Sequence, residues 1–309
     1  MNTKQIITAY IHALEYRPAT TRKTYTQGLK VYIKTVGVDA PINLQTYIKF
    51  LKSLSPYPAS TQHVYHNAAL GLYKFYCLEY DETVNLIAMK EAVKVYLKKG
   101  SSKLHFDRDN VSVLVEYAES MKYSSDDPDT ELRNLRDKAF ILLCVDSGLR
   151  ISEACALKRG QVPWEKKYIY IIGKGAKEER IRFSDRALRA IKQYLHKRAA
   201  MDGATGQPLD SMPLFARHDR GGGRRVKPVH SGGMWSAFVG HMRKAGIEKG
   251  AISPHKLRHE AITHMFETSN NIKTTMEFSR HSRMDTVNKY THLVDRVVDD
   301  AYEKAFNKR

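Results

Sequence analysis

Apolar residues recur every three or four positions along almost the whole chain, whereas strict two-residue alternation is confined to one short region. The first recurrence places apolar side chains on one face of an α-helix, and the second places them on one face of a β-strand. The alternating segment is Tyr168–Ile172, and a second strand is expected after a turn, at Arg180–Phe183. The pattern predicts a mainly α protein with a small antiparallel β-sheet, an α+β fold.

The 309 residues suffice for two domains, and a polar, basic stretch marks the expected boundary between them. We predict a helical N-terminal domain at residues 1–97, a linker at 98–104, a second domain at 105–292 and a C-terminal tail helix at 293–309. Helices are expected in the first domain at about 6–14, 25–37, 42–51, 60–76 and 81–97. In the second they are expected at about 109–121, 131–147, 152–157, 185–200, 231–245, 254–268, 271–278 and 284–290.

The composition is that of a water-soluble globular protein. A hydrophobic content of 42% supports two cores, and no apolar run approaches the roughly 18 residues that a membrane-spanning helix needs. The N-terminus lacks the pattern of a signal peptide, so we expect a cytoplasmic protein with no membrane partner. The three cysteines, Cys77, Cys144 and Cys155, lie far apart in apolar segments and are expected to be reduced thiols.

The positive charge is spread over both predicted domains. The chain has a formal net charge of +18, and residues 1–100 contain 13 Lys and Arg against 6 Asp and Glu. A basic tail would concentrate the surplus in one run, so this distribution favours a polyanion that contacts both domains. Charge that serves only solubility is the alternative interpretation.

Two short motifs resemble known sites but have the wrong geometry. His259 and His264 flank a glutamate as in zinc proteases, yet they are five residues apart where one helical face requires four. The Gly173–Lys177 segment is glycine-rich, but it lacks the phosphate-loop spacing and joins two strands. Neither a metal nor a nucleotide site is therefore expected, and the chain is predicted to need no cofactor.

Six widely spaced residues could each hold or attack a phosphodiester. Arg150 follows an apolar helix, where an arginine needs an anionic partner, and Lys174 lies on the turn between the two strands. His255 and Arg258 are three residues apart and are expected on one helical face. The remaining two are His281 and Tyr290, near the C-terminus. Each residue alone also has an ordinary structural explanation, as an ion-pair partner, a cap or a packed aromatic.

Together these residues resemble the tyrosine recombinases, the family of phage-type integrases and Xer-type resolvases. The matching stretches are 147–153, 172–177 and 255–259, followed by His281 and by Tyr290-Thr-His292. The family order is Arg, Lys, His-x-x-Arg, His, Tyr, and the intervals of 24, 23 and 9 residues are similar to those of the Xer-type branch. The resemblance covers most of the chain and implies a core-binding domain before the linker and a catalytic domain after it.

The chain departs from the family pattern at three places. Arg280 stands where the pattern before the second histidine usually has glycine, and Glu260 stands where threonine or serine usually follows Leu-Arg-His. The second strand lacks a frequent proline. We expect Arg280 and Glu260 to form a local ion pair.

The resemblance implies a role for each residue, and the chemistry agrees with it. Tyr290 would be the nucleophile, and Arg150 and Arg258, with His281, would stabilise charge on the nonbridging phosphate oxygens without a metal. Lys174 would protonate the departing 5′ oxygen, and His255 would accept the tyrosine proton. Glu153, one turn after Arg150, is expected to orient a neighbouring cation.

The resemblance also implies site-specific recombination of double-stranded DNA through a 3′-phosphotyrosine intermediate, independent of ATP. Family members work as tetramers through a four-way junction, so we expect a monomer or weak oligomer when free and a tail at 293–309 that docks onto a neighbouring protomer or packs on its own domain. Two alternatives stay open: relaxation of DNA in the manner of a type IB topoisomerase, and a noncatalytic DNA-binding relative. The target sequence and any accessory proteins are not predicted.

Overall fold

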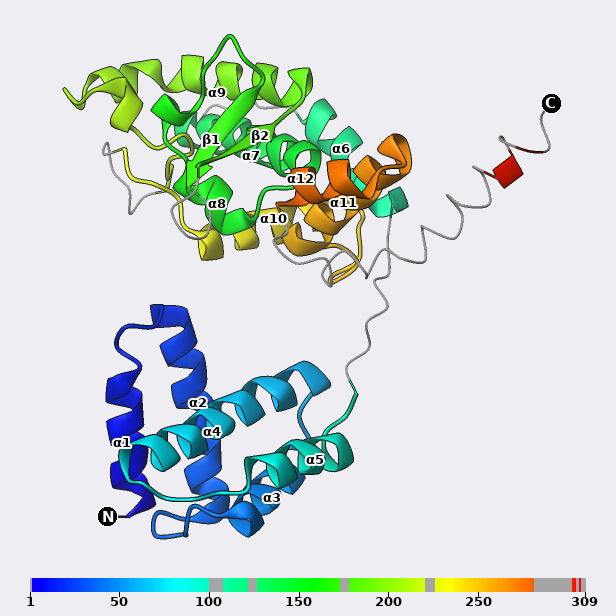
Figure 1. The fold of residues 1–309 in the computed structure, drawn as a ribbon. Coiled ribbons are helices and arrows are strands. Elements are labelled where there is room, and N and C mark those ends of the chain that lie inside the picture. The colour runs from blue at the N-terminus through cyan, green and yellow to red at the C-terminus, as the bar shows by residue number, and fades with distance from the viewer. Residues whose placement is uncertain are drawn as a thin grey trace. The chain divides into compact units, whose positions relative to one another are not determined.

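Two separate hydrophobic cores divide the chain into units of residues Met1–Ser102 and Lys103–Arg309 (Figure 1). The computed structural model describes residues 2–99, 108–121, 127–172, 178–219 and 226–280, together with 302, 303 and 306. The division falls inside the stretch predicted as a linker. The assignment of the first unit as a DNA-binding domain stays a prediction.

All regular secondary structure in the described part of the first unit is helical. They are α1 (Thr3–Ala13), α2 (Ala19–Val36), α3 (Leu44–Ser53), α4 (Ala59–Glu79) and α5 (Leu86–Tyr96). Asparagine side chains at positions 2, 43 and 85 accept hydrogen bonds from backbone N–H groups and start three of them. The last helix begins five residues later than predicted, because Asn85 caps it and Asp81 has a left-handed backbone with φ of 52°.

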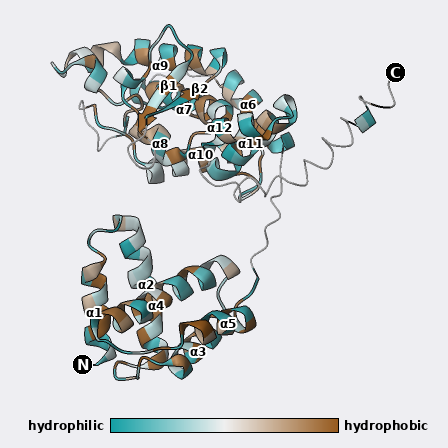
Figure 2. Cartoon of the chain, in the orientation of Figure 1, coloured by the Kyte–Doolittle hydropathy of each residue, from teal (hydrophilic) through white to brown (hydrophobic). Residues whose placement is uncertain are grey.

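Tyrosines fill much of the first core. Tyr32, Tyr47 and Tyr73 are fully buried around Phe50, and Figure 2 shows the apolar residues of these helices. The hydroxyl groups of Tyr32 and Tyr73 lie 2.8 Å apart, and Tyr73 also donates to the carbonyl oxygen of Asn43 at 3.0 Å. The buried hydroxyl groups therefore find partners inside the unit, which removes the cost of burying them.

The second unit combines helices with one small sheet. Its elements are α6 (Arg108–Ser120), α7 (Pro128–Ser147), α8 (Ile151–Ala156), the 3-10 turn η1 (Arg159–Gln161), β1 (Tyr168–Ile172), β2 (Glu178–Arg182), α9 (Asp185–Gly203), η2 (Leu209–Ser211), α10 (Ser231–Lys244), α11 (Pro254–Ser269) and α12 (Ile272–Ser279). The apolar α7 packs against α9, α11 and α6. The prediction of a mainly α fold with one small antiparallel sheet is confirmed for the described residues.

The two strands pair antiparallel, with Tyr168 opposite Arg182 and Ile172 opposite Glu178. The second strand therefore starts two residues earlier than predicted, because backbone pairing with Ile171 and Ile172 extends it through Glu178 and Glu179, which carry no apolar signal. One face of the sheet contributes Ile169, Ile171 and Ile181 to the core. The turn with Lys174 and the expected helix at 284–290 lie outside the described residues.

Three further expectations concern the composition. Cys144 and Cys155 are buried, Cys77 is partly buried, and all three are free thiols, as predicted. Across the described ranges, no helix combines the length and the apolar character that crossing a bilayer requires. The same ranges hold no cluster of three or more His, Cys, Asp or Glu side chains suited to a metal ion.

Candidate active site

The structure describes three of the six predicted site residues. Arg150, His255 and Arg258 lie at the α7–α8 turn and on α11, in the second unit. Lys174, His281 and Tyr290 lie outside the described residues.

The turn from α7 to α8 fixes the backbone of Arg150. Gly148 ends α7 in the left-handed conformation with φ of 62°, which glycine adopts without the steric cost of a Cβ atom. Leu149 is then fully buried, and its N–H donates to Ser147 Oγ at 3.3 Å. A buried anchor on one side and a helix start on the other leave Arg150 at the N-cap of α8.

Glu153 holds Arg150 from one helical turn away. Its carboxylate accepts from the Arg150 backbone N–H at 2.9 Å and from Nη1 at 2.7 Å. The Arg150 side chain is 46% exposed, so its guanidinium is both oriented and open to solvent. An arginine held in this way can bind an incoming phosphate oxygen without first being ordered.

Arg258 joins the same turn to the end of α12. It is 2% exposed on α11, and its guanidinium donates to the carbonyl oxygens of Gly148 and Ser279. These acceptors stand two residues before Arg150 and two residues before His281. Arg258 therefore brings together segments that are more than a hundred residues apart in the sequence.

His255 and Arg258 lie three residues apart on α11, the predicted helix, but they differ in exposure. Arg258 turns into the protein, while His255 is exposed. The neighbour of His255 is His259, one turn further along α11, with 3.0 Å between the two Nε2 atoms. The spacing of four residues aligns these rings more closely than a spacing of three.

The predicted ion pair between Arg280 and Glu260 is wrong. Glu260 on α11 accepts from Arg108 Nε of α6 at 3.0 Å. Arg280 instead binds Glu153 of α8 at 2.9 Å and Glu179 of β2 at 3.3 Å. Each side chain pairs with residues that are far away in the sequence, which the position of the two residues in the chain does not reveal.

The charges of this cluster set the ionisation of Glu153. Burial alone would raise its pKa, but hydrogen bonds from Arg280 and Arg150 outweigh burial and hold the pKa at about 2. Glu153 is therefore a carboxylate at neutral pH and holds two neighbouring cations, the role expected of it. For Glu260, burial dominates and the pKa is raised in spite of Arg108.

Arg280 is the residue of this site whose contacts sequence reasoning missed. It ends α12 with a left-handed backbone, φ 55°, and its side chain is 5% exposed. The available signal was its place in the chain, because the family pattern has glycine there and glycine favours this conformation. The pattern could indicate an unusual backbone but not the partners of the guanidinium.

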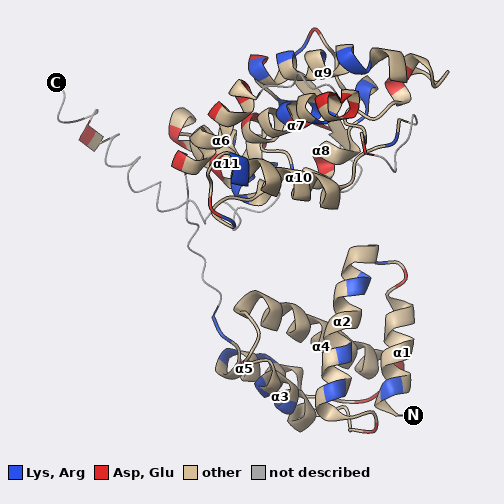
Figure 3. Cartoon of the chain, turned by 180° about the vertical axis from the view of Figure 1, so that it is seen from behind, with Lys and Arg blue, Asp and Glu red and all other residues tan. Residues whose placement is uncertain are grey.

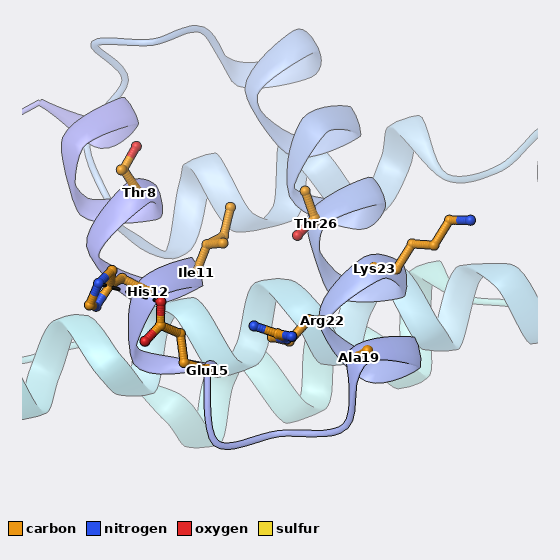
Figure 4. Close-up of a pocket in the computed structure, with 8 residues that line it drawn as sticks. All are labelled: Thr8, Ile11, His12, Glu15, Ala19, Arg22, Lys23 and Thr26. Carbon is orange, nitrogen blue, oxygen red and sulfur yellow. Dashed lines mark ion pairs between the residues drawn. The ribbon is translucent and has the colours of Figure 1, made fainter.

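The described residues form hollows in both units. One, of about 330 Å³, is beside Glu153 between α8, η1 and β1, and its lining includes Gln161 and Ile172. Another, of about 460 Å³, lies between α1 and α2 in the first unit (Figure 4), where Ile11 and Ala19 line it together with Arg22 and Lys23. Neither contains one of the six predicted site residues.

Comparisons with known proteins agree on one family. The sequence model of the phage integrase family matches residues 105–296. Tyrosine recombinase XerA of Pyrococcus furiosus is 32% identical over 172 residues, which are 55% of this chain and 55% of that protein. Tyrosine recombinase XerC of Pelobacter propionicus is 32% identical over 207 residues, 66% of this chain and 60% of that one. The chain thus spans little more than half the length of the curated relatives it matches.

Solved structures share the fold at low sequence identity. The Tn1549 transposon integrase in complex with transposon right end DNA aligns with a TM-score of 0.71 at 15% identity, covering 98% of this chain and 99% of that one. The XerH recombinase bound to its difH substrate aligns with a TM-score of 0.69 at 18% identity, covering 91% and 79%. A lambda integrase dimer bound to a core site gives 0.66 at 16% identity, covering 94% and 95%.

Proposed function

We propose that this chain, which belongs to the phage integrase family, is a site-specific recombinase that cleaves and rejoins double-stranded DNA through a 3′-phosphotyrosine intermediate. The observation that carries the proposal is that both predicted phosphate-binding arginines are held at the same turn, the one between α7 and α8. The buried Arg258 holds the carbonyl oxygen of Gly148, and Arg150 follows two residues later with its guanidinium oriented by Glu153. Two guanidiniums at one turn suit the charge that develops on a phosphodiester under attack.

Each remaining residue supplies one part of the reaction. The Tyr290 hydroxyl attacks phosphorus, a Tyr290–phosphate bond forms on the 3′ side, and the bond to the 5′ oxygen breaks. His255 takes the tyrosine proton, and Lys174 gives a proton to the departing 5′ oxygen. Arg150, Arg258 and His281 bind the nonbridging oxygens while negative charge accumulates there.

Reversal of these steps rejoins the strand. A 5′ hydroxyl from a partner duplex attacks the phosphotyrosine, and Tyr290 leaves with its proton restored. The phosphotyrosine linkage conserves the energy of the phosphodiester bond, so no nucleotide is consumed. The positive charges that stabilise the transition state are side chains, and the reaction should proceed in the presence of EDTA.

Both units are proposed to contact the duplex. The helices α1, α2 and α3 contain seven Lys and Arg and no Asp or Glu, and Figure 3 shows basic segments on α2 and α3. A surplus of basic residues on several neighbouring helices favours a polyanion partner. We therefore assign residues 1–97 to core binding, 98–104 to a linker and 105–292 to catalysis. The proposed setting is the cytoplasm, at the nucleoid when DNA is bound.

Assembly follows from the same assignment. Exchange between two duplexes requires four active protomers, and we propose a tetramer on DNA formed from a monomer or weak oligomer. The tail at 293–309 is proposed to dock onto the neighbouring protomer.

The test starts from a DNA site obtained by binding selection from duplexes with a randomised centre. The full chain should form a denaturant-resistant adduct with a nicked duplex of that site, in the presence of EDTA, and Tyr290→Phe should bind the duplex but form none. Joining of strands from two different duplexes supports recombination. Relaxation of supercoiled plasmid without such joining would favour the topoisomerase alternative, and binding without any adduct would favour a noncatalytic relative.

A further inference from the structure

We infer that Arg280 is a positioning residue: Glu179 anchors its guanidinium, and through Glu153 it holds the guanidinium of Arg150 in place. The inference rests on the proposed function, because it concerns the same reaction. It assigns to Arg280 a role beyond the six residues that the family pattern identifies.

Arg280 occupies an unfavourable backbone conformation. Its φ of 55° ends α12, and only glycine adopts this region without steric cost. A long cation at this position is also removed from water, since its side chain is 5% exposed. Both costs need an offset, and two carboxylates supply one: Glu153 Oε2 at 2.9 Å and Glu179 Oε2 at 3.3 Å from the two terminal nitrogens.

One of these partners leads to the proposed reaction. Glu153 also binds Arg150 through its side chain and backbone, so the guanidiniums of Arg280 and Arg150 share one carboxylate. Glu179 is the second residue of β2 and holds Arg280 from the sheet. Arg280 itself precedes His281 in the chain.

The charges of the cluster balance. Two guanidiniums, of Arg150 and Arg280, face two carboxylates, of Glu153 and Glu179. Arg280 gives both terminal nitrogens to the carboxylates and is buried, whereas Arg150 is 46% exposed. Both terminal nitrogens of Arg280 are therefore held by carboxylates, while the guanidinium of Arg150 stays exposed beside the same Glu153.

A pair of substitutions separates positioning from simple stability. Arg280→Gly and Arg280→Ala both remove the guanidinium, but only glycine relieves the left-handed backbone, so the alanine variant should melt at a lower temperature. If Arg280 positions Arg150, both variants should lower the single-turnover cleavage rate at saturating DNA equally, by about 10- to 100-fold. Their dissociation constants for the selected duplex should stay within about twofold of the unmodified chain, because the loss is of orientation rather than of binding.

A substrate with a bridging 5′ sulfur shows which group is positioned. A thiolate leaves without a proton, so this substrate restores variants that lack the acid, such as Lys174→Ala. Arg280→Gly and Glu153→Gln loosen Arg150 rather than the acid, so both should stay slow on it. Glu179→Gln should lose less of the rate than Glu153→Gln, because only Glu153 contacts Arg150. Arg280→Lys should restore little of the rate, because an ammonium cannot reach two carboxylates with the planar fork of a guanidinium.

The outcomes distinguish the inference from the proposed function. If the unmodified chain forms no adduct dependent on Tyr290, the proposed function fails and the inference fails with it. If it forms that adduct and Arg280→Gly cleaves at an undiminished rate, the inference alone fails. Rate losses that follow melting temperature, with alanine far slower than glycine, would also overturn it, as would recovery of Arg280→Gly on the sulfur substrate.

Discussion

The two units bury polar groups in different ways. Among the described residues, the buried polar side chains of the first unit are Thr3, Thr46, Gln62 and His66. All four are uncharged at neutral pH, because burial lowers the pKa of His66 to about 4. Those of the second unit include the charged Arg136, Asp137, Arg198, Asp202, Arg258 and Glu260. The core of the first unit is formed by regular helices. The second unit also contains irregular backbone, whose buried carbonyl groups need hydrogen-bond partners.

Arg198 shows what the buried charges do in the second unit. It is fully buried on α9, and it donates to the carbonyl oxygens of Pro213 and Leu214 and to the carboxylate of Asp202. Arg136 donates to the carbonyl oxygen of Ala216 in the same segment. A guanidinium has five N–H donors, so one side chain can satisfy several carbonyl groups that no strand partner reaches. Arg258 does the same at the candidate site.

The largest expected effect tests this difference directly. Arg198→Met should lower the free energy of unfolding of the second unit by about 3–5 kcal/mol, because it leaves carbonyl groups and part of Asp202 buried without partners. Hydrogen exchange of the full chain should show lost protection in α7 and α9 and unchanged protection in α2 and α4. The control is Arg189→Met, on an exposed position of the same helix. Equal effects of the two substitutions would break the comparison.

The matching change in the first unit should cost less. Tyr73→Phe removes one hydroxyl that bonds both Tyr32 and the carbonyl oxygen of Asn43. We expect a loss of about 1–2 kcal/mol, because the groups left unpaired are neutral. Hydrogen exchange should place the loss in α2 and α4. Tyr16→Phe is the control, since that side chain is 98% exposed and should leave stability unchanged. A loss as large as that of Arg198→Met would contradict the distinction between neutral and charged cores.

The smallest effect depends on pH. Glu153→Gln should lower stability at pH 7 by at most about 1 kcal/mol, because water screens a partly exposed carboxylate. The folded pKa of Glu153, about 2, lies below its ordinary value of 4.5. Its stabilising contribution is therefore present above pH 4.5 and is lost as the pH falls toward 2. Denaturation across that range should show the two curves converging in acid. A difference that grows as the pH falls would reverse the assignment.

Sequence patterns predicted the regular parts of both units. Helical spacing of apolar residues located α1 to α5 and most of the second unit, and the one alternating segment located β1, because periodicity reports directly on a buried face. The prediction of helix at Asp81–Asn85 is wrong, because apolar periodicity does not report backbone conformation. The left-handed Asp81 and the Asn85 cap place the start of the helix after Asn85.

The candidate site was predicted in part. Local motifs identified Arg150, His255 and Arg258, but not that Arg258 turns inward to carbonyl oxygens or that His255 meets His259. The ion pairs of Arg280 join residues 127 and 101 positions apart, and the pairing of distant charges depends on packing that no local pattern encodes. The Arg280–Glu260 prediction failed for that reason.

Chemical identification of the protein–DNA linkage tests the account most directly. The full chain is incubated with a nicked duplex of its selected site, the adduct is digested with protease and nuclease, and the nucleotide-bearing peptide is sequenced by mass spectrometry. The account expects a 3′-phosphate on Tyr290 and a free 5′ hydroxyl on the released strand. Attachment through a 5′-phosphate, attachment to another residue, or cleaved ends with no attached protein would contradict it.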